Sequence, residues 1–556
     1  MPDRGLAFVN GVVHTVDDAL PRAEAIAVRD GRIVAVGTDD EARAAAGSGA
    51  EVLDLGGRMV LPGFQDAHVH APPGGVHLNL CDLHDAGDAA AYAAIIAAYA
   101  AAHPDRPWVH GSGWAMDRFP GGTPHRRDLD ALVPDRPAFL SNRDGHGAWV
   151  NTRALELAGV TATTPDPFDG RIERDPDGSP SGTLHEGAMH LVDRLIPKIT
   201  RAQWDEGLLA GQRYLHAFGI TAWQDAIVGG SYDSLDSYIE ATRAGTLTAR
   251  VVAALWWDRT RGMEQIPEFV ERRERAAAVG FRATSIKIMQ DGVLENFTAA
   301  LVDPYLDADG NPTDNSGISF VDPALLVEAV PELDRLGFQV HIHALADRAV
   351  REGLDAIEEA RRRNGMNDLR HHIAHIQVVH PDDVPRFRAL GVHANMQPLW
   401  ATLEDQMTDL TIPFLGEERT RWQYPFRTLL DAGAEMAAGS DWPVTSTDPL
   451  WEIAVAVHRR HPRCRPATGR AHDETFLPEQ RITLDEAIRA FTLGSARVNH
   501  LDDRTGTLTV GKEADLVVVD RDLSTQDLEG LGEARVECTL VAGRAVHAVG
   551  PFAGLA

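Results

Sequence analysis

Eight strand-like apolar runs alternate with helix-like segments through the middle of the chain, and this order constrains the fold more than any other feature. Such alternation is typical of βα units that build a parallel sheet. Eight is also the number of strands that closes a (β/α)8 barrel. The runs are VLPGFQDAHVH, GITAWQDA, ARVVAALWW, TSIKIMQDG, FQVHIHA, HHIAHIQ, GVHANMQP and EMAAGSDWPV. We therefore predict an α/β fold with a TIM-type barrel.

Both ends of the chain carry short alternating strands around glycine turns. The start reads LAFVNGVVHTV, AIAVRDGRIVAVG and EVLDLGGRMVLPG, with a hairpin turn at Asp30-Gly31, and the end reads GTLTVGKEADLVVVD and VECTLVAGRAVHAVG. Each end alone offers too few strands for a stable sheet. We predict one small β-sandwich domain from residues 1–62 and 502–556, flanking a barrel domain of residues 63–501.

The segment between the first and second runs, residues 71–218, is longer than a single crossover helix requires. It contains an alanine-rich helical stretch, a strand PAFLSN followed by RDGHGAW, and a hairpin GRIERDPDGSPSGTL. We predict an insertion that covers the mouth of the barrel as a lid. Two turn-rich segments, residues 295–320 and 400–426, follow the fourth and seventh runs. They would lie at the C-terminal rim, where a barrel keeps its active site.

Charge and cysteine usage exclude several classes of function. A net charge of −29 argues against binding to nucleic acid or to an anionic membrane surface. Cys81, Cys464 and Cys538 are widely spaced and form no CxxC pair, so neither a disulfide framework nor a thiolate zinc site is indicated. No signal pattern or membrane-length apolar run is present. We expect a cytoplasmic protein that acts on a small molecule.

Residues of metal-ligand type recur at the C-terminal ends of the predicted strands. A lone strand histidine is more often a hydrogen-bonded core residue than a ligand. Chance does not readily place six such residues at the ends of five of eight strands, and they would converge at the barrel mouth. The predicted ligands are His68 and His70 of the first run, Lys287 of the fourth, His343 of the fifth, His375 of the sixth and Asp441 of the eighth. Spacing alone does not separate His341 from His343, or His372 from His375.

Lysine at position 287 is unusual, because only three lysines occur among 53 basic residues. The plain explanation is a lysine that snorkels from a strand end. Arginine could serve that purpose, but it cannot replace a primary amine. A neutral lysine that captures carbon dioxide becomes a carbamate, an anion able to bridge two metal ions, and burial favours the neutral amine. We therefore expect Lys287 to be carboxylated.

The full combination resembles the amidohydrolase superfamily, and within it the formamide-deformylase-like branch, amidohydrolase family 3. The blocks DGHGAWVNTRAL, IKIMQDG, HIHALADRAV, HIAHIQ, GSDWPV and GKEADLVV are similar to recurring blocks of that family and span essentially the whole chain. The resemblance implies two divalent metal ions, zinc by expectation, with a bridging hydroxide as nucleophile. It places His68, His70, Lys287 and Asp441 around one ion, and Lys287, His343 and His375 around the other. It also implies a homodimer.

The expected reaction is hydrolysis of a carbon–nitrogen bond outside peptides, in an amide or an N-substituted formamide. Asp441 would act as general base and pass the proton to the leaving nitrogen. Two alternatives remain. The same centre could open a cyclic amide, hydrolyse a carbamate or deaminate a heterocycle. The barrel could also belong to a non-catalytic regulatory or binding protein, although a complete ligand set argues against that.

Further residues are assigned to the substrate. His146 of the insertion could reach over the mouth to bind the substrate carbonyl or the oxyanion. Asp291 and Gly292 could form a turn or contact the substrate. His185-Glu186 is expected to open a helix and to be structural, with Glu186 at the helix N-terminus. Rim aromatics could line an apolar pocket or pin loops down: Trp114, Phe119, Trp400, Trp422 and Tyr424.

Overall fold

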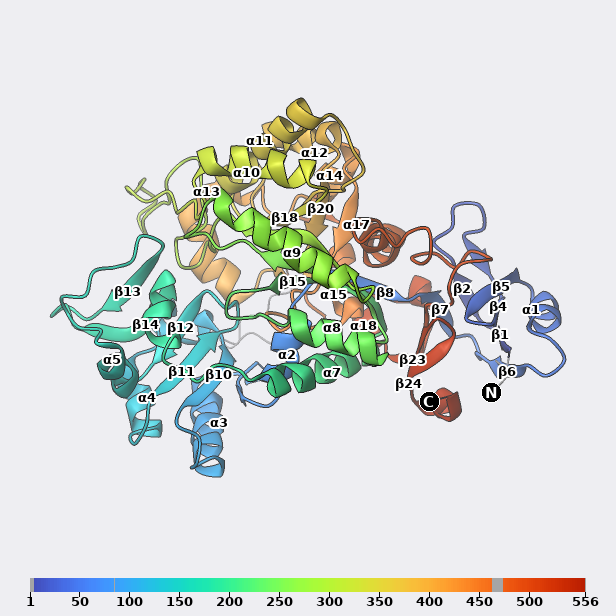
Figure 1. The fold of residues 1–556 in the computed structure, drawn as a ribbon, viewed down its shortest axis with the longest axis horizontal. Helices are drawn as coiled ribbons and strands as arrows, with labels where there is room; N and C mark the ends of the chain where they lie inside the picture. Colours follow the sequence, from blue (N-terminus) through green and yellow to red (C-terminus); the bar gives the residue numbers. More distant parts are fainter. Residues whose placement is uncertain (1–4, 85, 463–473, 556) are drawn as a thin grey trace.

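The barrel lies between the other two parts of the molecule in the computed structural model, which describes residues 5–84, 86–462 and 474–555. Strands of both chain ends form one side of the molecule, and the insertion forms the opposite side (Figure 1). The two described ends of the chain lie close together on the side of the terminal strands.

All eight predicted runs are strands of one parallel sheet, and they follow each other around the ring in chain order. The sheet closes because Asp441 N–H donates to His68 O (2.8 Å) and His70 N–H donates to Trp442 O (2.9 Å). The predicted barrel is therefore confirmed. Its strands are β8 (Phe64–Val69), β15 (Ile220–Val228), β16 (Arg250–Trp256), β17 (Arg282–Met289), β18 (Gln339–Ala344), β19 (His372–His375), β20 (His393–Met396) and β21 (Met436–Ala438).

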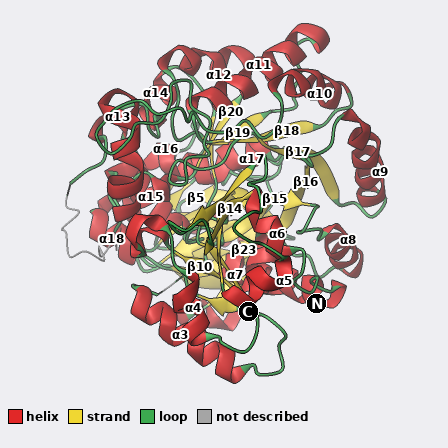
Figure 2. Ribbon diagram, turned by 90° about the vertical axis from the view of Figure 1, so that its left-hand side faces the viewer, coloured by secondary structure: helices red, strands yellow, loops and turns green. Residues whose placement is uncertain are grey.

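Helices surround the strands of the barrel (Figure 2). In α11 (Asp347–Asn364), for example, Val350, Leu354 and Ile357 recur at helical spacing and are fully buried. The helices of this layer are α2 (Ala71–His77), α7 (Arg201–Ala217), α8 (Leu235–Ala244), α9 (Ile266–Ala277), α10 (Pro323–Arg335), α11 (Asp347–Asn364), α12 (Val384–Leu390), α13 (Ile412–Thr420), α14 (Phe426–Asp431), α15 (Pro449–His458), α16 (Leu484–Arg489), α17 (Ser495–Val498) and α18 (Leu528–Glu533).

Strands from both chain ends share one sheet, because β7 pairs antiparallel with β22 through Met59 opposite Val519 and Leu61 opposite Val517. The two sheets here have the orders β5-β4-β1-β6 and β24-β23-β22-β7-β2-β3. Asp30 and Gly31 form the predicted turn, both with positive φ. The elements are β1 (Leu6–Val9), β2 (Val12–His14), β3 (Arg22–Ala23), β4 (Ala25–Arg29), β5 (Arg32–Gly37), α1 (Asp39–Ala46), β6 (Glu51–Asp54), β7 (Met59–Pro62), β22 (Leu516–Val519), β23 (Val536–Val541) and β24 (Arg544–Ala548).

The insertion has a sheet of its own, with the order β13-β14-β12-β11-β10-β9. The predicted alanine-rich helix, the strand PAFLSN and the hairpin are all present, as α3, β11 and β13–β14. The elements are β9 (Cys81–Asp82), α3 (Ala89–Ala102), β10 (Val109–Trp114), α4 (Arg126–Leu132), β11 (Ala138–Asn142), β12 (Gly147–Val150), α5 (Thr152–Ala158), β13 (Gly170–Arg174), β14 (Pro180–Glu186) and α6 (His190–Asp193).

Cys81 and Cys538 are buried free thiols, and Cys464 lies outside the described residues. Across the described ranges, none of the helices combines the length and the apolar character that crossing a membrane requires.

Candidate functional site

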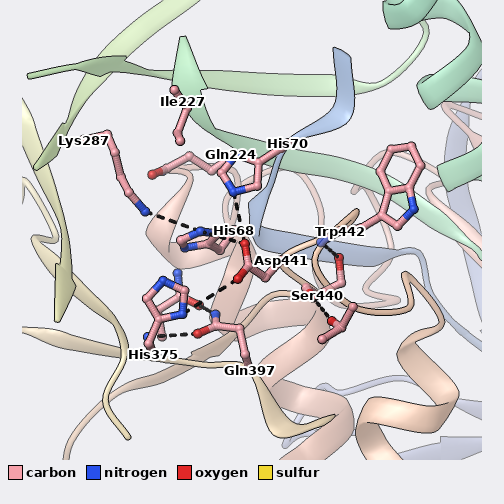
Figure 3. A network of polar contacts seen from close by, with 12 residues as sticks. His68, His70, Gln224, Ile227, Lys287, His375, Gln397, Ser440, Asp441 and Trp442 are labelled. Atoms are coloured by element: carbon pink, nitrogen blue, oxygen red, sulfur yellow. Dashed lines mark hydrogen bonds and ion pairs between the residues drawn. The ribbon is translucent and has the colours of Figure 1, made fainter. Parts of the chain in front are cut away.

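The end of β8 and the loop after β21 bring the first group of polar side chains together (Figure 3). His70 Nε2 lies 3.0 Å from Asp441 Oδ1, and His68 Nε2 lies 3.3 Å from the same oxygen. The potential ligand atoms of these three residues all lie within 4.8 Å of one another. Two imidazole nitrogens and one carboxylate oxygen at this separation form a donor set suited to zinc or a related divalent ion.

The loop that carries Asp441 is fastened to β8 by a buried carboxylate. Asp66 accepts hydrogen bonds from the backbone amides of His68 (2.9 Å) and Ser440 (3.1 Å), and from Ser440 Oγ (2.5 Å). Gly439 is required at this crossing, since a Cβ there would lie 2.5 Å from His68 N. Asp441 itself has φ 56°, a left-handed conformation that aspartate tolerates better than most residues. These contacts hold His68 and Asp441 in register across the closure of the barrel.

Lys287, near the C-terminal end of strand β17, points into the same space (Figure 3). Its Nζ lies 3.3 Å from His68 Nε2, and the side chain is buried. Burial lowers the pKa of Lys287 to about 7, although the nearby Asp441 opposes the shift. A neutral amine is the form that reacts with carbon dioxide, so the environment suits a carbamate.

The rings of His343 and His375 lie side by side, with centroids 4.4 Å apart. They form the second part of the cluster, next to His68 and Asp441. His375 is also 4.7 Å from His68, centroid to centroid, and its Nδ1 lies 4.0 Å from Asp441 Oδ2. Among the described residues, His343 Nδ1 and His375 Nε2 are buried nitrogens without a hydrogen-bond partner. His343 Nδ1 has the carboxylate of Asp291 at 3.5 Å, and both nitrogens are of the kind that can bind a divalent ion.

His341 and His372 differ from these two residues, because both of their ring nitrogens have partners. His341 lies 2.7 Å from Gln224 Oε1 through Nδ1 and 2.9 Å from His68 Nδ1 through Nε2. His372 lies 3.0 Å from Gln224 Oε1 through Nε2 and 3.2 Å from Asn395 Nδ2 through Nδ1. The geometry therefore favours His343 and His375 as ligands, the choice that spacing left open.

Protonation in this cluster suits cation binding. Burial lowers the pKa of His68 to about 3, with Lys287 acting in the same direction and Asp441 against it. Burial also holds the pKa of His343 and His375 well below the usual value, so all three imidazoles are neutral. Burial works to raise the pKa of Asp441, but the neighbouring histidines outweigh it and hold that pKa well below its ordinary range. Neutral imidazoles and an ionised carboxylate are the forms that bind metals.

His146 of the insertion reaches the cluster, with its ring centroid 5.6 Å from that of His343. His146 Nδ1–H donates to Glu186 Oε1 at 2.8 Å, and the ring of His146 is partly buried. Burial works to lower the pKa of His146, but Glu186 and Asp144 outweigh it and raise the pKa to about 9. His146 is thus a cation in the metal-free protein, with Nε2–H as its second donor.

Glu186 was expected at the start of a helix, and this is confirmed: it is the last residue of β14 and, with φ 52°, the N-cap of a 3-10 helix, Gly187–Met189, that leads into α6. Its carboxylate contacts His146, Thr298 (2.9 Å) and Asn296 (3.4 Å), and a side chain on Gly292 would collide with it at 2.5 Å. Glu186 is the site residue that sequence reasoning missed. The one available signal was the adjacent pair His185-Glu186, which was assigned a structural role at the start of a helix.

The carboxylate of Asp291 is hydrogen-bonded by backbone amides. It accepts from the amides of Leu345 (2.9 Å), Ala346 (3.0 Å) and Ala300 (2.9 Å), and Oδ1 lies 3.5 Å from His343 Nδ1. The residue anchors the loop after β18 and faces the ring of His343. These contacts account for its carboxylate without a substrate.

The candidate rim aromatics lie in different environments. Trp114 is fully buried in the core of the insertion, where Nε1–H donates to Leu140 O (2.7 Å) and the ring packs edge-on against Phe119. This is a packing role, and it removes Trp114 from the mouth. Trp400 and Trp422 are only partly buried and belong to segments that follow barrel strands. Tyr424 is buried, and its carbonyl accepts from Arg459.

Comparison with known proteins agrees with this geometry. The model of a family described as Amidohydrolase family matches residues 51–547. Protein LONG AFTER FAR-RED 3 of Arabidopsis thaliana is 31% identical over 98% of this chain and 91% of its own. N-substituted formamide deformylase of Arthrobacter pascens is 29% identical, with 93% and 94% covered. A crystal structure of an uncharacterized metal-dependent hydrolase from Pyrococcus furiosus has a TM-score of 0.68 at 27% identity, with 93% and 99% covered.

Proposed function

The chain belongs to the amidohydrolase family, and we propose that it hydrolyses an amide or an N-substituted formamide with the help of two divalent metal ions. Family membership supports the coarser statement, a metal-dependent hydrolase of carbon–nitrogen bonds outside peptides. The observation that carries the proposed metal centre is the convergence of His68, His70 and Asp441, with ligand atoms within 4.8 Å, beside the buried amine of Lys287.

The donor set fits a pair of ions. His68, His70 and Asp441 would hold one ion, and His343 and His375, whose unpartnered buried nitrogens support the assignment, would hold the other. Lys287 would contribute to both as a carbamate formed with carbon dioxide. Zinc is the expected metal, because imidazole and carboxylate ligands suit it. When bound, such ions polarise a substrate carbonyl and lower the pKa of a water molecule.

Asp441 is placed to move protons. Its side chain touches His68 and His70 through Oδ1, and its second oxygen faces His375 at 4.0 Å. We assign it as the general base, which takes a proton from the attacking water and delivers it to the leaving nitrogen. The carboxylate is ionised in the resting protein, as a base must be.

His146 is placed to stabilise negative charge. Nδ1 is committed to Glu186, so the free donor is Nε2–H on a ring beside His343. A donor held in a buried site before the reaction stabilises a developing oxyanion without reorganising. We assign His146 to the substrate carbonyl oxygen and Glu186 to the positioning of His146.

The choice of substrate rests on similarity. The formamide deformylase of Arthrobacter pascens aligns with nearly the whole chain at 29% identity. Its name describes cleavage of a formyl group from a substituted nitrogen, which is one case of the chemistry that these residues allow.

A substrate panel tests the proposal. Protein loaded with zinc in bicarbonate buffer is assayed with N-substituted formamides, simple amides, cyclic ureas and aminated heterocycles. We expect release of formate or another carboxylate with the amine, and about a thousand-fold lower kcat for Asp441→Asn with metal retained at least in part. Turnover of the cyclic or heterocyclic compounds alone would overturn the substrate class. Full activity of Asp441→Asn would remove the general-base assignment.

A further inference from the structure

A layer of polar side chains lies inside the barrel beneath the candidate metal ligands. Barrel interiors are usually filled by branched apolar residues. Here the described positions include amides and imidazoles that are almost completely buried: Gln224, Gln339, His341, His372, Asn395 and Gln397. Buried polar groups are costly unless each finds a partner, so the orientation of every member is constrained by the others.

Two backbone carbonyls next to Gln339 fix the direction of the hydrogen bonds in this layer. Gln339 Nε2 donates to Arg370 O (2.9 Å) and Val498 O (2.8 Å). A carbonyl can only accept, so the amide nitrogen of Gln339 must face these groups and Oε1 must face inward. Gln224 Nε2 donates to this Oε1 at 2.9 Å and to Asn499 Oδ1 at 3.1 Å. The oxygen of Gln224 is therefore turned toward the histidines.

A second anchor gives the same orientation independently. Asn395 Nδ2 donates to Ala67 O (3.0 Å), so the same nitrogen must be the donor to His372 Nδ1 at 3.2 Å. With Nδ1 accepting, the proton of neutral His372 is on Nε2, which lies 3.0 Å from Gln224 Oε1. Two separate sets of backbone carbonyls thus agree that Gln224 Oε1 is an acceptor.

The orientation of Gln224 also fixes the proton position on His68, through the ring of His341. His341 Nδ1, 2.7 Å from Gln224 Oε1, must carry a proton, so Nε2 of the neutral ring is an acceptor. His341 Nε2 lies 2.9 Å from His68 Nδ1, which must then be protonated. The lone pair of His68 is left on Nε2. That atom faces Lys287 Nζ and Asp441 Oδ1, each at 3.3 Å. A lone pair opposite a carboxylate oxygen is repulsive unless a cation lies between them.

We propose that Gln339, Gln224 and His341 form a relay of hydrogen bonds that fixes His68 in the tautomer with Nε2 free for a metal ion. The inference rests on the proposed function only in taking His68 as a ligand. The three relay members are positioning residues, because none of them meets the substrate. Outer partners of this kind typically change metal affinity by about 10- to 100-fold when they are removed.

Zinc affinity of two substitutions at one position tests the relay. Glutamine at position 341 can present an oxygen acceptor to His68 Nδ1, whereas leucine cannot. We expect His341→Gln to bind zinc nearly as tightly as the wild type in competition with a chromogenic chelator, and His341→Leu to bind about 10- to 100-fold more weakly. The matched control is His216→Leu, which replaces another buried histidine, in α7, and should not change zinc affinity.

Equal weakening in both position-341 variants, or none in the leucine variant, would overturn the relay. If the wild type binds no zinc, the proposed function fails but the relay is still tested by NMR. Long-range proton–nitrogen spectra of metal-free protein carrying ¹⁵N-histidine report the tautomer, with His68 assigned by its loss in His68→Gln. We expect the Nδ1–H form of His68 in the wild type and in His341→Gln. The Nε2–H form in the wild type would contradict the relay, whatever the stability of the variants.

Discussion

Lys287 is the residue on which the two-metal proposal depends most. Its side chain is fully buried on a barrel strand, lies 3.3 Å from His68 Nε2, and has a pKa lowered to about 7. Its type could be singled out from the sequence, because lysine is so rare in this chain. Its place beside His68 and Asp441 was expected from the strand ends and the family resemblance, but the 3.3 Å contact with His68 depends on the packing of strands that are distant in sequence.

Replacing Lys287 by arginine tests the carbamate. Arginine keeps size and charge roughly, so we expect a native-like circular dichroism spectrum. It cannot react with carbon dioxide, so we expect loss of one or both metal ions and turnover below detection. Metal content and kcat are measured on the same preparation. A fully active Lys287→Arg protein would refute the carbamate.

The lowered pKa of Lys287 also predicts a dependence of stability on pH in metal-free, carbon-dioxide-free buffer. Between about pH 7 and 10.5 the unfolded chain holds a proton on this lysine that the folded chain has released. Stability rises with pH wherever the unfolded state binds more protons. The free energy of unfolding of the wild type should therefore increase relative to that of Lys287→Met as pH rises through this window. A pH-independent difference between the two urea curves would contradict the assignment.

At the scale of the element, the barrel strands were predictable and the insertion was predictable only in part. The eight barrel strands are short runs rich in apolar residues, and five of them carry a residue of metal-ligand type at or near the C-terminal end, which is a local signal. Strand β14 is placed by pairing with β12 and β13, and this non-local pairing brings Glu186, at the junction of β14 and the following 3-10 helix, to His146. The amides and the histidines His341 and His372 inside the barrel were not recognised as a network, because hydrogen-bond partners on other strands leave no trace in a single run.

The end of β14 joins the insertion to the loop after β17, and its contribution can be measured. Glu186→Gln should lower the charge on His146 and slow the reaction by about 10- to 100-fold in kcat, with metal content unchanged, because the oxyanion donor is weakened. His146→Asn should have at least as large an effect. The matched control is Glu173→Gln on neighbouring β13, whose carboxylate pairs with Arg171 and His185. A kcat for Glu186→Gln equal to that of this control would remove Glu186 from the site.

At the scale of the whole molecule, the candidate site lies where the first and last strands of the barrel meet. His70 and Asp441 are 371 residues apart in the chain, and the remaining donors come from β17, β18 and β19. An ion that binds all of them binds only the folded barrel, so it stabilises the native state by mass action. We expect removal of metal by a chelator to lower the melting temperature, and zinc with bicarbonate to restore it. An identical melting curve with and without metal would show that no ion links these strands.

The most direct measurement is elemental analysis of protein purified without chelator and with bicarbonate present, alongside His70→Ala and Lys287→Arg. We predict about two zinc-like ions per wild-type chain, the number that a carbamate-bridged pair requires, and fewer in both variants. One ion per chain, unchanged in Lys287→Arg, would contradict the bridged pair. No bound ion in the wild type, even after reconstitution, would contradict the metal-dependent hydrolase itself.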